Sequence, residues 1–404
     1  MVGFQLLVII LAFSIGCDFC RAEEALESID CPIPLILTVA SDSSGFQFFL
    51  SNSGLVSIIS LVKGKKAHER LWGPKWLEAG TQSVILPTNI VSGKTGTLEC
   101  FTLNIEPSAT IGRAGKGERQ FIRPMGMGWD PTHKELYVCD TGNDRVVRLS
   151  ADGRFISQYG GFGVAFGDSM EEREDSLNEP WDVAPGGFSN MYVADLNNNR
   201  ICEFDAYKSF RGNLFPKKDD RQNRLDQPKG IVVDNENNVW AVDSRSDRVL
   251  KLSPSGVKLF ELGGFGWSKW QFKDPSQVAV DPDGKIYVCD RGHRRIQVFD
   301  RFGSHLFEIK DNLNSPVGIS VDPDGLIWVS DDRTNEVSIF TPDGKRLDFF
   351  PKASKGDRLR APSDLVSLEN FVFILDSGNH RIVVFKRSKK AFSSSWNARD
   401  VVLK

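Results

Sequence analysis

A short pattern recurs along the chain, and one copy reads Leu136-Tyr137-Val138-Cys139-Asp140-Thr141-Gly142-Asn143-Asp144-Arg145-Val146. Close copies span residues 286–296 and 372–382, and more diverged copies span 192–201, 240–249 and 328–337. The acid that anchors each copy is Asp140, Asp195, Asp243, Asp290, Asp331 or Asp376. A proline precedes every copy, at Pro124, Pro180, Pro228, Pro275, Pro316 and Pro362. Two features that keep the same phase in every copy establish an internal repeat.

Each repeat reads as four short strands. The first strand follows the proline, as in residues 230–234, and a turn such as Asp281-Pro282-Asp283-Gly284 leads to the second. Residues 295–299 illustrate the third strand, and a further turn leads to an outer fourth. Alternating apolar residues, β-branched content and turns at this spacing favour antiparallel sheet over helix. Six such units predict an all-β fold, a six-bladed β-propeller.

The repeats also carry a family resemblance. The pattern of Pro-x-Gly, an apolar strand, Asp, a turn and Tyr-Val-x-Asp-x-Gly-Asn-His-Arg-Ile resembles the NHL repeat, and residues 376–382 are close to its ideal form. Residues 112–121 and 263–272 resemble the glycine-rich approach that precedes such a repeat. The resemblance covers residues 101–386 and implies a six-bladed NHL propeller. It implies a fold rather than one activity, because propellers host unrelated functions.

The regions around the repeats complete the predicted domain organisation. Residues 23–99 contain several strand-like pieces and predict a small β-rich region, which resembles the Ig-like sandwich that precedes propellers in some exported bacterial proteins. An extended linker is the alternative. We assign residues 100–386 to the propeller and 387–404 to a basic C-terminal tail. Because the sixth repeat stops after its third strand, we predict that a strand within residues 100–111 supplies its outer strand.

The N-terminus predicts export. Residues 4–16 are almost continuously apolar, and Cys20-Arg21-Ala22 places small residues at the −3 and −1 positions of a cut before Glu23. We therefore predict a signal peptide over residues 1–22 and a secreted, periplasmic or cell-surface protein. Ser14-Ile15-Gly16-Cys17 also resembles a lipobox, which leaves a lipid anchor at Cys17 as the alternative to free secretion.

Composition narrows the class of protein. Of 404 residues, 40% are hydrophobic and 25% are charged, which excludes a disordered chain and a polytopic membrane protein. The net charge of −3 makes nucleic acid and anionic membranes unfavoured partners. Cys31 and Cys100 bracket the region before the repeats and are our predicted disulfide. Cys139, Cys202 and Cys289 lie at strand positions and are predicted to be buried apolar residues.

An Asp with an Arg five residues later is the most regular charge pattern. It occurs as Asp140/Arg145, Asp195/Arg200, Asp243/Arg248, Asp290/Arg295 and Asp376/Arg381. Because it repeats in nearly every unit, we interpret it as a structural pair across a tight hairpin. The fifth repeat differs, with Asp331, Asp332 and Glu336, where Glu336 stands in place of the Arg. These three acids predict a Ca²⁺ site, and the alternative is a solvated acidic loop with Arg333 as counter-charge.

The residues that follow the repeat prolines form a second candidate site. Asp182, Gln277 and Asp364 replace the glycine of the family pattern in alternate repeats. The starts of the first strands ring the mouth of a propeller's channel, so we expect these polar side chains to converge on the axis. Together with Trp181 and Lys229 they are our predicted ligand-binding residues. The alternative is that they hydrogen-bond to channel water.

These features predict a monomeric, non-enzymatic scaffold that binds a protein, peptide or glycan partner outside the cytoplasm. No cofactor is expected apart from Ca²⁺. Two alternatives follow from the resemblance, because six-bladed relatives include a zinc-dependent amidating lyase and gluconolactonase-like hydrolases, and some NHL propellers bind RNA. A zinc enzyme needs converging histidines. His68 precedes the repeats, and the other four histidines, His133, His293, His305 and His380, lie in the first, fourth and sixth repeats, so the set is not expected to meet in one channel.

Overall fold

The computed structural model describes residues 35–39, 45–50, 54–60, 69–77, 80–85 and 96–396, with gaps at 162–174, 188–189, 206, 208, 217–223 and 351–357. The predicted signal peptide and Cys31 lie outside the described residues. The chain divides into two compact units, Met1–Asn104 with Ser388–Lys404 and Ile105–Arg387.

The first unit contains short antiparallel strands. Strands β1 (Leu35–Val39), β2 (Gly45–Leu50) and β5 (Gly80–Ile85) form a three-stranded sheet. Strand β3 (Gly54–Ser60) pairs with β4 (Glu69–Leu77) on one side and with residues 96–101 on the other. Five strands therefore lie within the region predicted to be β-rich. Its Ig-like character stays a prediction.

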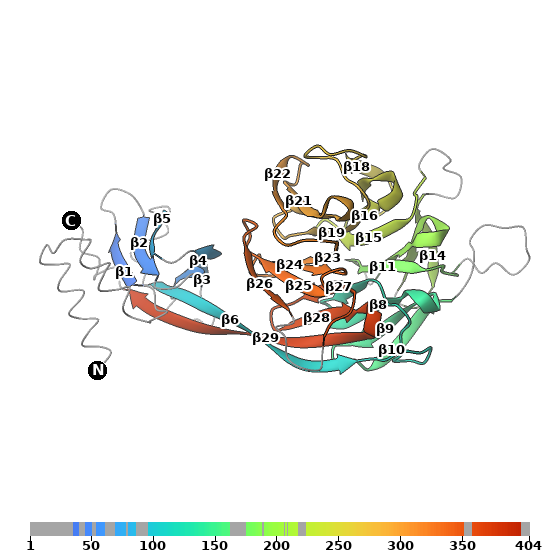
Figure 1. Ribbon diagram of the computed structural model, residues 1–404, viewed down its shortest axis with the longest axis horizontal. Coiled ribbons are helices and arrows are strands. Elements are labelled where there is room, and N and C mark those ends of the chain that lie inside the picture. The colour runs from blue at the N-terminus through green and yellow to red at the C-terminus, as the bar shows by residue number, and fades with distance from the viewer. Residues whose placement is uncertain are drawn as a thin grey trace, which may run out of the picture. The chain divides into compact units, whose positions relative to one another are not determined.

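The second unit is a six-bladed β-propeller (Figure 1). Blade 1 contains β7 (Met127–Asp130), β8 (Glu135–Asp140), β9 (Arg145–Ser150) and β10 (Phe155–Gly160). Blade 2 contains β11 (Pro180–Pro185), β12 (Met191–Asp195), β13 (Arg200–Phe204) and β14 (Phe210–Phe215). Blade 3 contains β15 (Pro228–Val233), β16 (Val239–Asp243), β17 (Arg248–Leu252) and β18 (Lys258–Gly263). Blades 4 and 5 follow the same plan, with β19 (Pro275–Val280), β20 (Ile286–Asp290), β21 (Arg295–Phe299) and β22 (His305–Ile309), then β23 (Pro316–Val321), β24 (Ile327–Asp331), β25 (Glu336–Phe340) and β26 (Arg346–Phe350). The first strand of each blade contacts the first strand of the next, and β27 contacts β7, which closes the ring.

Blade 6 is completed by a strand from earlier in the chain. It contains β27 (Pro362–Ser367), β28 (Phe371–Asp376) and β29 (Arg381–Trp396), and β6 (Gly96–Ile111) lies next to β29 in the same sheet. Ile111 packs in one apolar cluster with residues of blades 1 and 6. The predicted closure by an N-terminal strand is confirmed.

The end of β29 differs from the predicted tail. The strand continues to Trp396, so much of the segment expected to be a basic tail is β-strand. Its Lys and Ser residues hid the strand, because pairing is made by backbone groups and does not need an apolar pattern.

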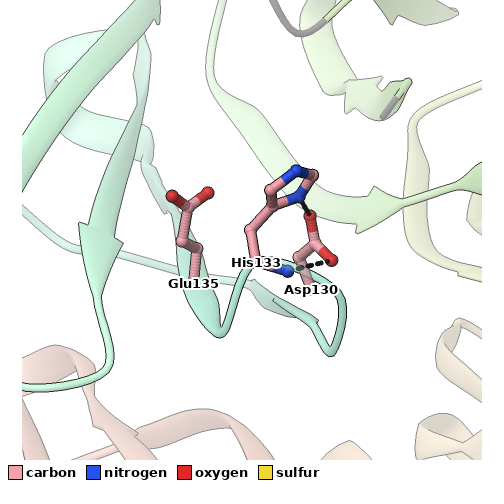
Figure 2. A group of neighbouring side chains, drawn as sticks. All are labelled: Asp130, His133 and Glu135. Carbon is pink, nitrogen blue, oxygen red and sulfur yellow. Dashed lines mark hydrogen bonds and ion pairs between the residues drawn. The ribbon is translucent and has the colours of Figure 1, made fainter. Parts of the chain in front are cut away.

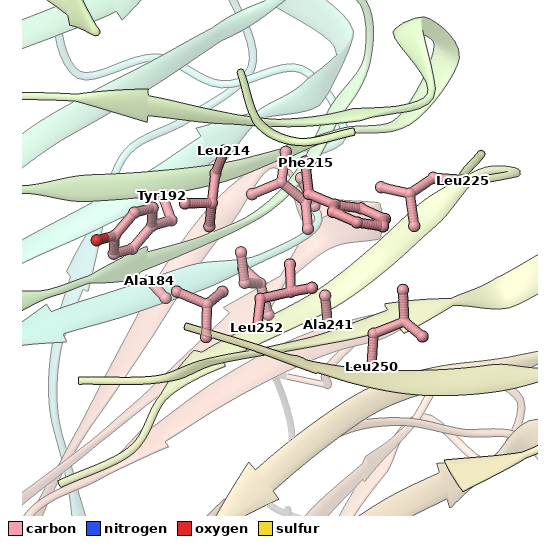
Figure 3. Close-up of a cluster of buried hydrophobic side chains, with 12 residues drawn as sticks. Ala184, Tyr192, Leu214, Phe215, Leu225, Ala241, Leu250 and Leu252 are labelled. Atoms are coloured by element: carbon pink, nitrogen blue, oxygen red, sulfur yellow. The ribbon is translucent and has the colours of Figure 1, made fainter. Parts of the chain in front are cut away.

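The core lies between neighbouring blades. Figure 3 shows the cluster between blades 2 and 3, in which Tyr192, Leu214 and Phe215 face Leu250 and Leu252. Burying each large side chain of this kind stabilises the fold by about 1.5–3 kcal/mol. Cys139, Cys202 and Cys289 are buried free thiols, and burial raises the pKa of all three. In the described part of the chain, no helix has the length and hydropathy needed to cross a membrane.

Candidate functional site

The anchoring acids hold the turn between the second and third strands of each blade. In five blades the Asp Oδ2 lies 2.7–2.9 Å from the Nε of the Arg five residues later, in the pairs Asp140/Arg145, Asp195/Arg200, Asp243/Arg248, Asp290/Arg295 and Asp376/Arg381. The other carboxylate oxygen accepts a backbone N–H from the segment before the first strand, as in the 2.7 Å bond from Ile122 to Asp140. Fully buried carboxylates with this many partners fix the hairpin.

In blade 5 the anchoring acid Asp331 holds the turn between the second and third strands without an arginine partner. Asp331 accepts backbone N–H groups of Asn314 and Ser315 through one oxygen and of Arg333 and Thr334 through the other. Asp332 instead pairs with Arg291, and Glu336 pairs with Arg346.

The predicted Ca²⁺ site is therefore not assembled by Asp331, Asp332 and Glu336, whose carboxylates bind three different sets of partners. Among the described residues, the group whose ligand atoms lie within 4.8 Å of one another is Asp130, His133 and Glu135.

Asp130, His133 and Glu135 lie on the hairpin between β7 and β8 (Figure 2). His133 Nδ1 lies 2.6 Å from Asp130 Oδ2, while Glu135 Oε2 lies 2.5 Å from Arg148 Nε. Burial alone would raise the pKa of Asp130, but its hydrogen bonds with His133 and Thr132 leave that pKa below its usual value. These contacts account for the group as part of a hairpin, since each side chain already has a partner.

The first strands begin on one face of the propeller, which we call the upper face; the opposite face is the lower face. There the structure brings together three of the predicted ligand-binding residues. Asp182, Gln277 and Asp364 are only 1%, 7% and 3% exposed. Gln277 Nε2 donates to Asp182 Oδ2 at 2.8 Å, and the same oxygen accepts the Ile231 N–H of blade 3 at 2.9 Å. Asp364 accepts the Met127 N–H of blade 1 at 2.8 Å. We call this group the channel ring.

The glycines of the alternate blades make room for the channel ring. A Cβ on Gly230 would lie 2.0 Å from Gln277 Oε1, and one on Gly126 would lie 2.3 Å from Asp182 Oδ1. Gly318 is similarly close to the Asp364 backbone. The alternation of glycine with Asp or Gln noticed in the sequence is therefore a packing requirement, because each polar side chain occupies the space left by the glycine of a neighbouring blade.

The two carboxyl groups of the channel ring hold their protons unusually tightly. Burial raises the pKa of Asp182 to about 7. Burial, together with the charge of Asp182, raises the pKa of Asp364 well above its usual value. Two buried acids close to each other cannot both ionise readily, because no described residue forms an ion pair with either of them to offset the lost hydration.

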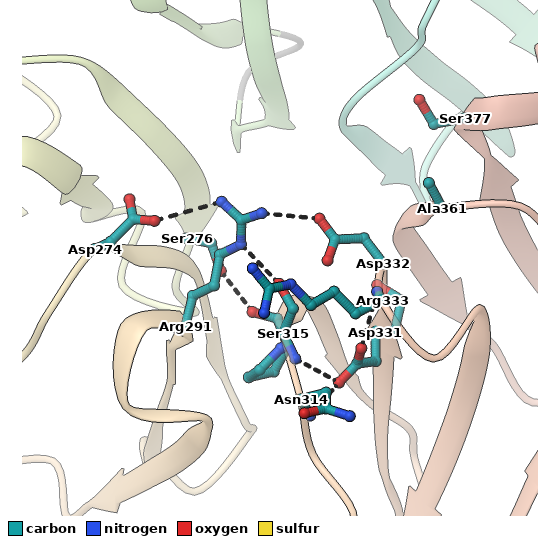
Figure 4. A network of polar contacts seen from close by, with 12 residues as sticks. Asp274, Ser276, Arg291, Asn314, Ser315, Asp331, Asp332, Arg333, Ala361 and Ser377 are labelled. Carbon is teal, nitrogen blue, oxygen red and sulfur yellow. Dashed lines mark hydrogen bonds and ion pairs between the residues drawn. The ribbon is translucent and has the colours of Figure 1, made fainter.

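Trp181 and Lys229 join a chain of contacts that crosses blades on the upper face. Lys229 Nζ lies 5.3 Å from the centre of the Trp181 ring and 2.7 Å from Asp274 Oδ1. Asp274 also contacts Arg291, whose guanidinium reaches Asp332 at 2.9 Å and Ser315 Oγ at 2.9 Å (Figure 4). Lys229 is buried, so it supports this network more than it presents a charge to solvent.

A cavity of about 320 Å³ lies beside this network, between blades 4 and 5. Its lining includes Lys273, Arg291, Arg294, Asn314, Ser315 and Arg333. We call it the blade 4–5 cavity. Sequence reasoning missed Lys273, Arg291 and Arg294 of blade 4, because the cavity forms only where they meet residues of blade 5 such as Ser315 and Arg333. The substitution of Arg294 for the usual small polar residue is the one signal that could have revealed it.

Exposed aromatic side chains lie in the same loop as Lys273, one of the residues that line the cavity. Phe265, Trp267 and Trp270 are 68%, 73% and 58% exposed in the loop between β18 and β19. The Trp267 ring lies 4.2 Å from the ring of His293, and Lys273 Nζ lies 5.8 Å from the Trp267 centroid. The loop therefore places an exposed aromatic ring beside a cation of the cavity lining.

The four-stranded units and their closed ring define a six-bladed β-propeller. The NHL repeat family model matches residues 272–299 and 313–340, so these two segments of the propeller are NHL repeats. It is 23% identical over 211 residues to SUPPRESSOR OF QUENCHING 1 of Arabidopsis thaliana, a match that covers 46% of this chain and 20% of that protein. It is 33% identical over 81 residues to human NHL repeat-containing protein 3, covering 19% of this chain and 23% of that protein.

The matches to these relatives span less than a quarter of their length. Among solved structures, an aldose sugar dehydrogenase from Streptomyces coelicolor in its PQQ-bound form aligns with a TM-score of 0.50 and 12% identity, over 71% of this chain and 99% of that chain. At this identity the likeness concerns the fold alone.

Proposed function

We propose that the protein is a non-catalytic scaffold that binds a protein, peptide or glycan partner on the upper face of its propeller. The observation that carries this proposal is the exposed Trp267 beside Lys273 of the cavity lining, in a loop that also exposes Phe265 and Trp270. Exposed aromatic rings are typical of the centres of interfaces, because they bury a large area with few rotatable bonds.

The channel ring supports a structural role for the propeller axis. A catalytic acid or base must come within hydrogen-bonding distance of a substrate. Asp182 and Asp364 are nearly fully buried and accept backbone N–H groups from blades 3 and 1. Raised carboxyl pKa values can mark an active site, but here burial between blades explains them without a substrate.

A monomeric chain with no cofactor apart from Ca²⁺ remains part of the proposal. The proposed location outside the cytoplasm rests on the sequence alone. Its basis is the apolar segment of residues 4–16 and the cut expected before Glu23. Mass spectrometry of the protein purified from its own cells tests it. A mature N-terminus at Glu23 supports free secretion, and a lipidated Cys17 supports an anchor.

Site-specific photo-crosslinking tests the binding face. A benzophenone amino acid replaces Trp267 in one variant and Phe302 in the other; Phe302 is 79% exposed and lies in the turn between β21 and β22 on the lower face. We expect a recurrent adduct of one macromolecule from position 267 and none of it from position 302. Equal adducts from both positions, or none from position 267, would contradict the proposal.

Measurements on the purified full chain also distinguish this scaffold function from the enzyme and RNA-binding alternatives. Stoichiometric zinc in the purified full chain would favour the lyase or hydrolase alternative. Crosslinking of RNA at position 267 would favour the nucleic-acid alternative.

A further inference from the structure

Neighbouring blades are joined on the upper face by a repeated hydrogen bond. The residue before a first-strand proline donates its backbone N–H to a side chain in the turn of the preceding blade. The five bonds of this kind run from Arg123 to His380 Nδ1, Glu179 to Asp144 Oδ1, Gln227 to Asn199 Oδ1, Asp274 to Asp247 Oδ1 and Ala361 to Asn335 Oδ1, at 2.7–3.0 Å. In every case the acceptor residue has a positive φ of 52–59°.

The junction between blades 4 and 5 departs from this rule. Arg294 occupies the acceptor position, with a φ of 56°. A guanidinium has only donors and cannot accept the bond. The Ser315 N–H, which would be the donor, bonds to Asp331 Oδ2 of its own blade at 2.7 Å instead. The blade 4–5 cavity lies at this junction.

Some cations that line the cavity form ion pairs, and others form none with a described residue. Arg291 is held by Asp274, Asp332 and Ser315. Lys273, Arg294 and Arg333 are exposed and form no ion pair with any described residue. Asp274 also lines the cavity, but it pairs with Arg291, so the cations of the lining outnumber its acids. An excess of exposed cations around a concave site favours an anionic ligand.

We propose that the blade 4–5 cavity binds the carboxylate side chains of an acidic peptide segment in a partner protein. Arg294 and Arg333 would contact the carboxylates, and Lys273 would add charge at the rim. Trp267 would pack against an apolar residue of the same segment. This inference rests on the proposed scaffold function and adds the chemistry of the partner.

The distribution of charge favours a peptide over RNA. A nucleic acid needs a track of cations along its backbone. Here three cations without an ion pair to a described residue surround one hollow, and the acids Asp274 and Asp332 lie beside them. The neighbouring junction between blades 3 and 4 carries an acid, Asp247, at the position of Arg294. A compact acidic cluster fits this arrangement better than a long polyanion.

Fluorescence anisotropy with a labelled Glu-Glu-Leu-Glu-Glu peptide tests the proposal on the full chain, and the same peptide with Gln for every Glu is the ligand control. We expect the Glu peptide to bind at least about tenfold more tightly than the Gln peptide. The double variant Arg294→Glu/Arg333→Glu should weaken binding of the Glu peptide by at least about tenfold.

The matched control is Lys134→Glu/Arg301→Glu, which makes the same change in net charge at exposed turns on the lower face. We expect this variant to bind within about twofold of the wild type. Equal binding of both peptides, or equal losses in both variants, would overturn the proposal. Tighter binding of an oligouridine RNA that needs Arg294 and Arg333 would also overturn it.

Thermal unfolding of both variants checks that they remain folded. The crosslink from position 267 can also be measured in Arg294→Glu/Arg333→Glu. If the same adduct still forms, the scaffold function is supported and the acidic-peptide inference is contradicted.

Discussion

The channel ring and the blade 4–5 cavity are both polar regions where blades meet on the upper face. They differ in burial and in pairing: the polar groups of the channel ring are buried and hydrogen-bonded, while cations of the cavity are exposed and form no ion pair with a described residue. In the channel ring, Asp182 accepts from Gln277, Val183 and Ile231, and almost no surface reaches solvent. In the cavity, Arg294 and Arg333 are exposed and form no ion pair with a described residue. Polar groups that satisfy one another stabilise a fold, while exposed cations around a hollow are available to a ligand.

Removing a buried acceptor should have the largest effect. Asp182→Ala leaves the N–H groups of Val183 and Ile231 and the Gln277 amide without their partner. Because each buried unsatisfied group costs about 1–3 kcal/mol, we expect urea unfolding to show a loss of about 3–5 kcal/mol. Arg294→Ala in the cavity should stay within about 0.5 kcal/mol of the wild type. Similar losses in both variants would remove the distinction between the two regions.

Filling the space beside Gln277 should have the next largest effect. In Gly230→Ala the new Cβ would meet Gln277 Oε1, so we expect a loss of about 1–3 kcal/mol of unfolding free energy. Gln277→Ala in the same chain should recover part of that loss, because it removes the atom that clashes. A double-mutant cycle with no coupling between the two positions would contradict the packing explanation of the glycine alternation.

The channel ring should also make stability depend on pH. Because the folded pKa of Asp182 is raised from 3.8 to about 7, the folded state holds a proton that the unfolded chain releases. This stabilisation is fully present below about pH 4 and is lost as the pH rises to about 7. We expect a loss on the order of 1–3 kcal/mol across that window.

Asp364→Asn isolates this dependence from that of the other titrating groups. It removes the like charge near Asp182 and keeps an acceptor for the Met127 N–H. Chemical unfolding at several pH values should give a flatter profile for Asp364→Asn than for the wild type. The cavity variant Arg294→Ala should keep the wild-type profile. An unchanged profile in Asp364→Asn would show that the two acids are not coupled.

The smallest expected effect is a gain in stability. Arg294 has a left-handed backbone, which Asn adopts more easily than Arg. We expect Arg294→Asn to stabilise the protein by about 0.5 kcal/mol and to weaken binding of the Glu peptide. A loss of stability would indicate that Arg294 serves the fold, as the anchoring arginines do.

The candidate site was only partly predictable from the sequence. Asp182, Gln277 and Asp364 could be found because they replace the glycine at a fixed position of the repeat. The structure brings them together. Their burial could not be foreseen, since it depends on the glycines of neighbouring blades. Lys229 was expected at an open channel mouth and is instead buried against Trp181 and Asp274.

By itself, the sequence determined the six blades, their strand order and the Asp–Arg pairs within each turn. These features depend on residues close together in the chain and recur in most copies, so local pattern is enough to read them. The missing fourth strand of the last repeat and the replaced glycines also predicted that an N-terminal strand completes blade 6 and that Asp182, Gln277 and Asp364 converge. Only the tertiary structure decided that Asp182 and Asp364 are buried and that Lys273, Arg294 and Arg333 surround one cavity. The reason is that burial and the cavity both depend on how neighbouring blades pack, and the cations of the cavity follow no repeated pattern in the sequence.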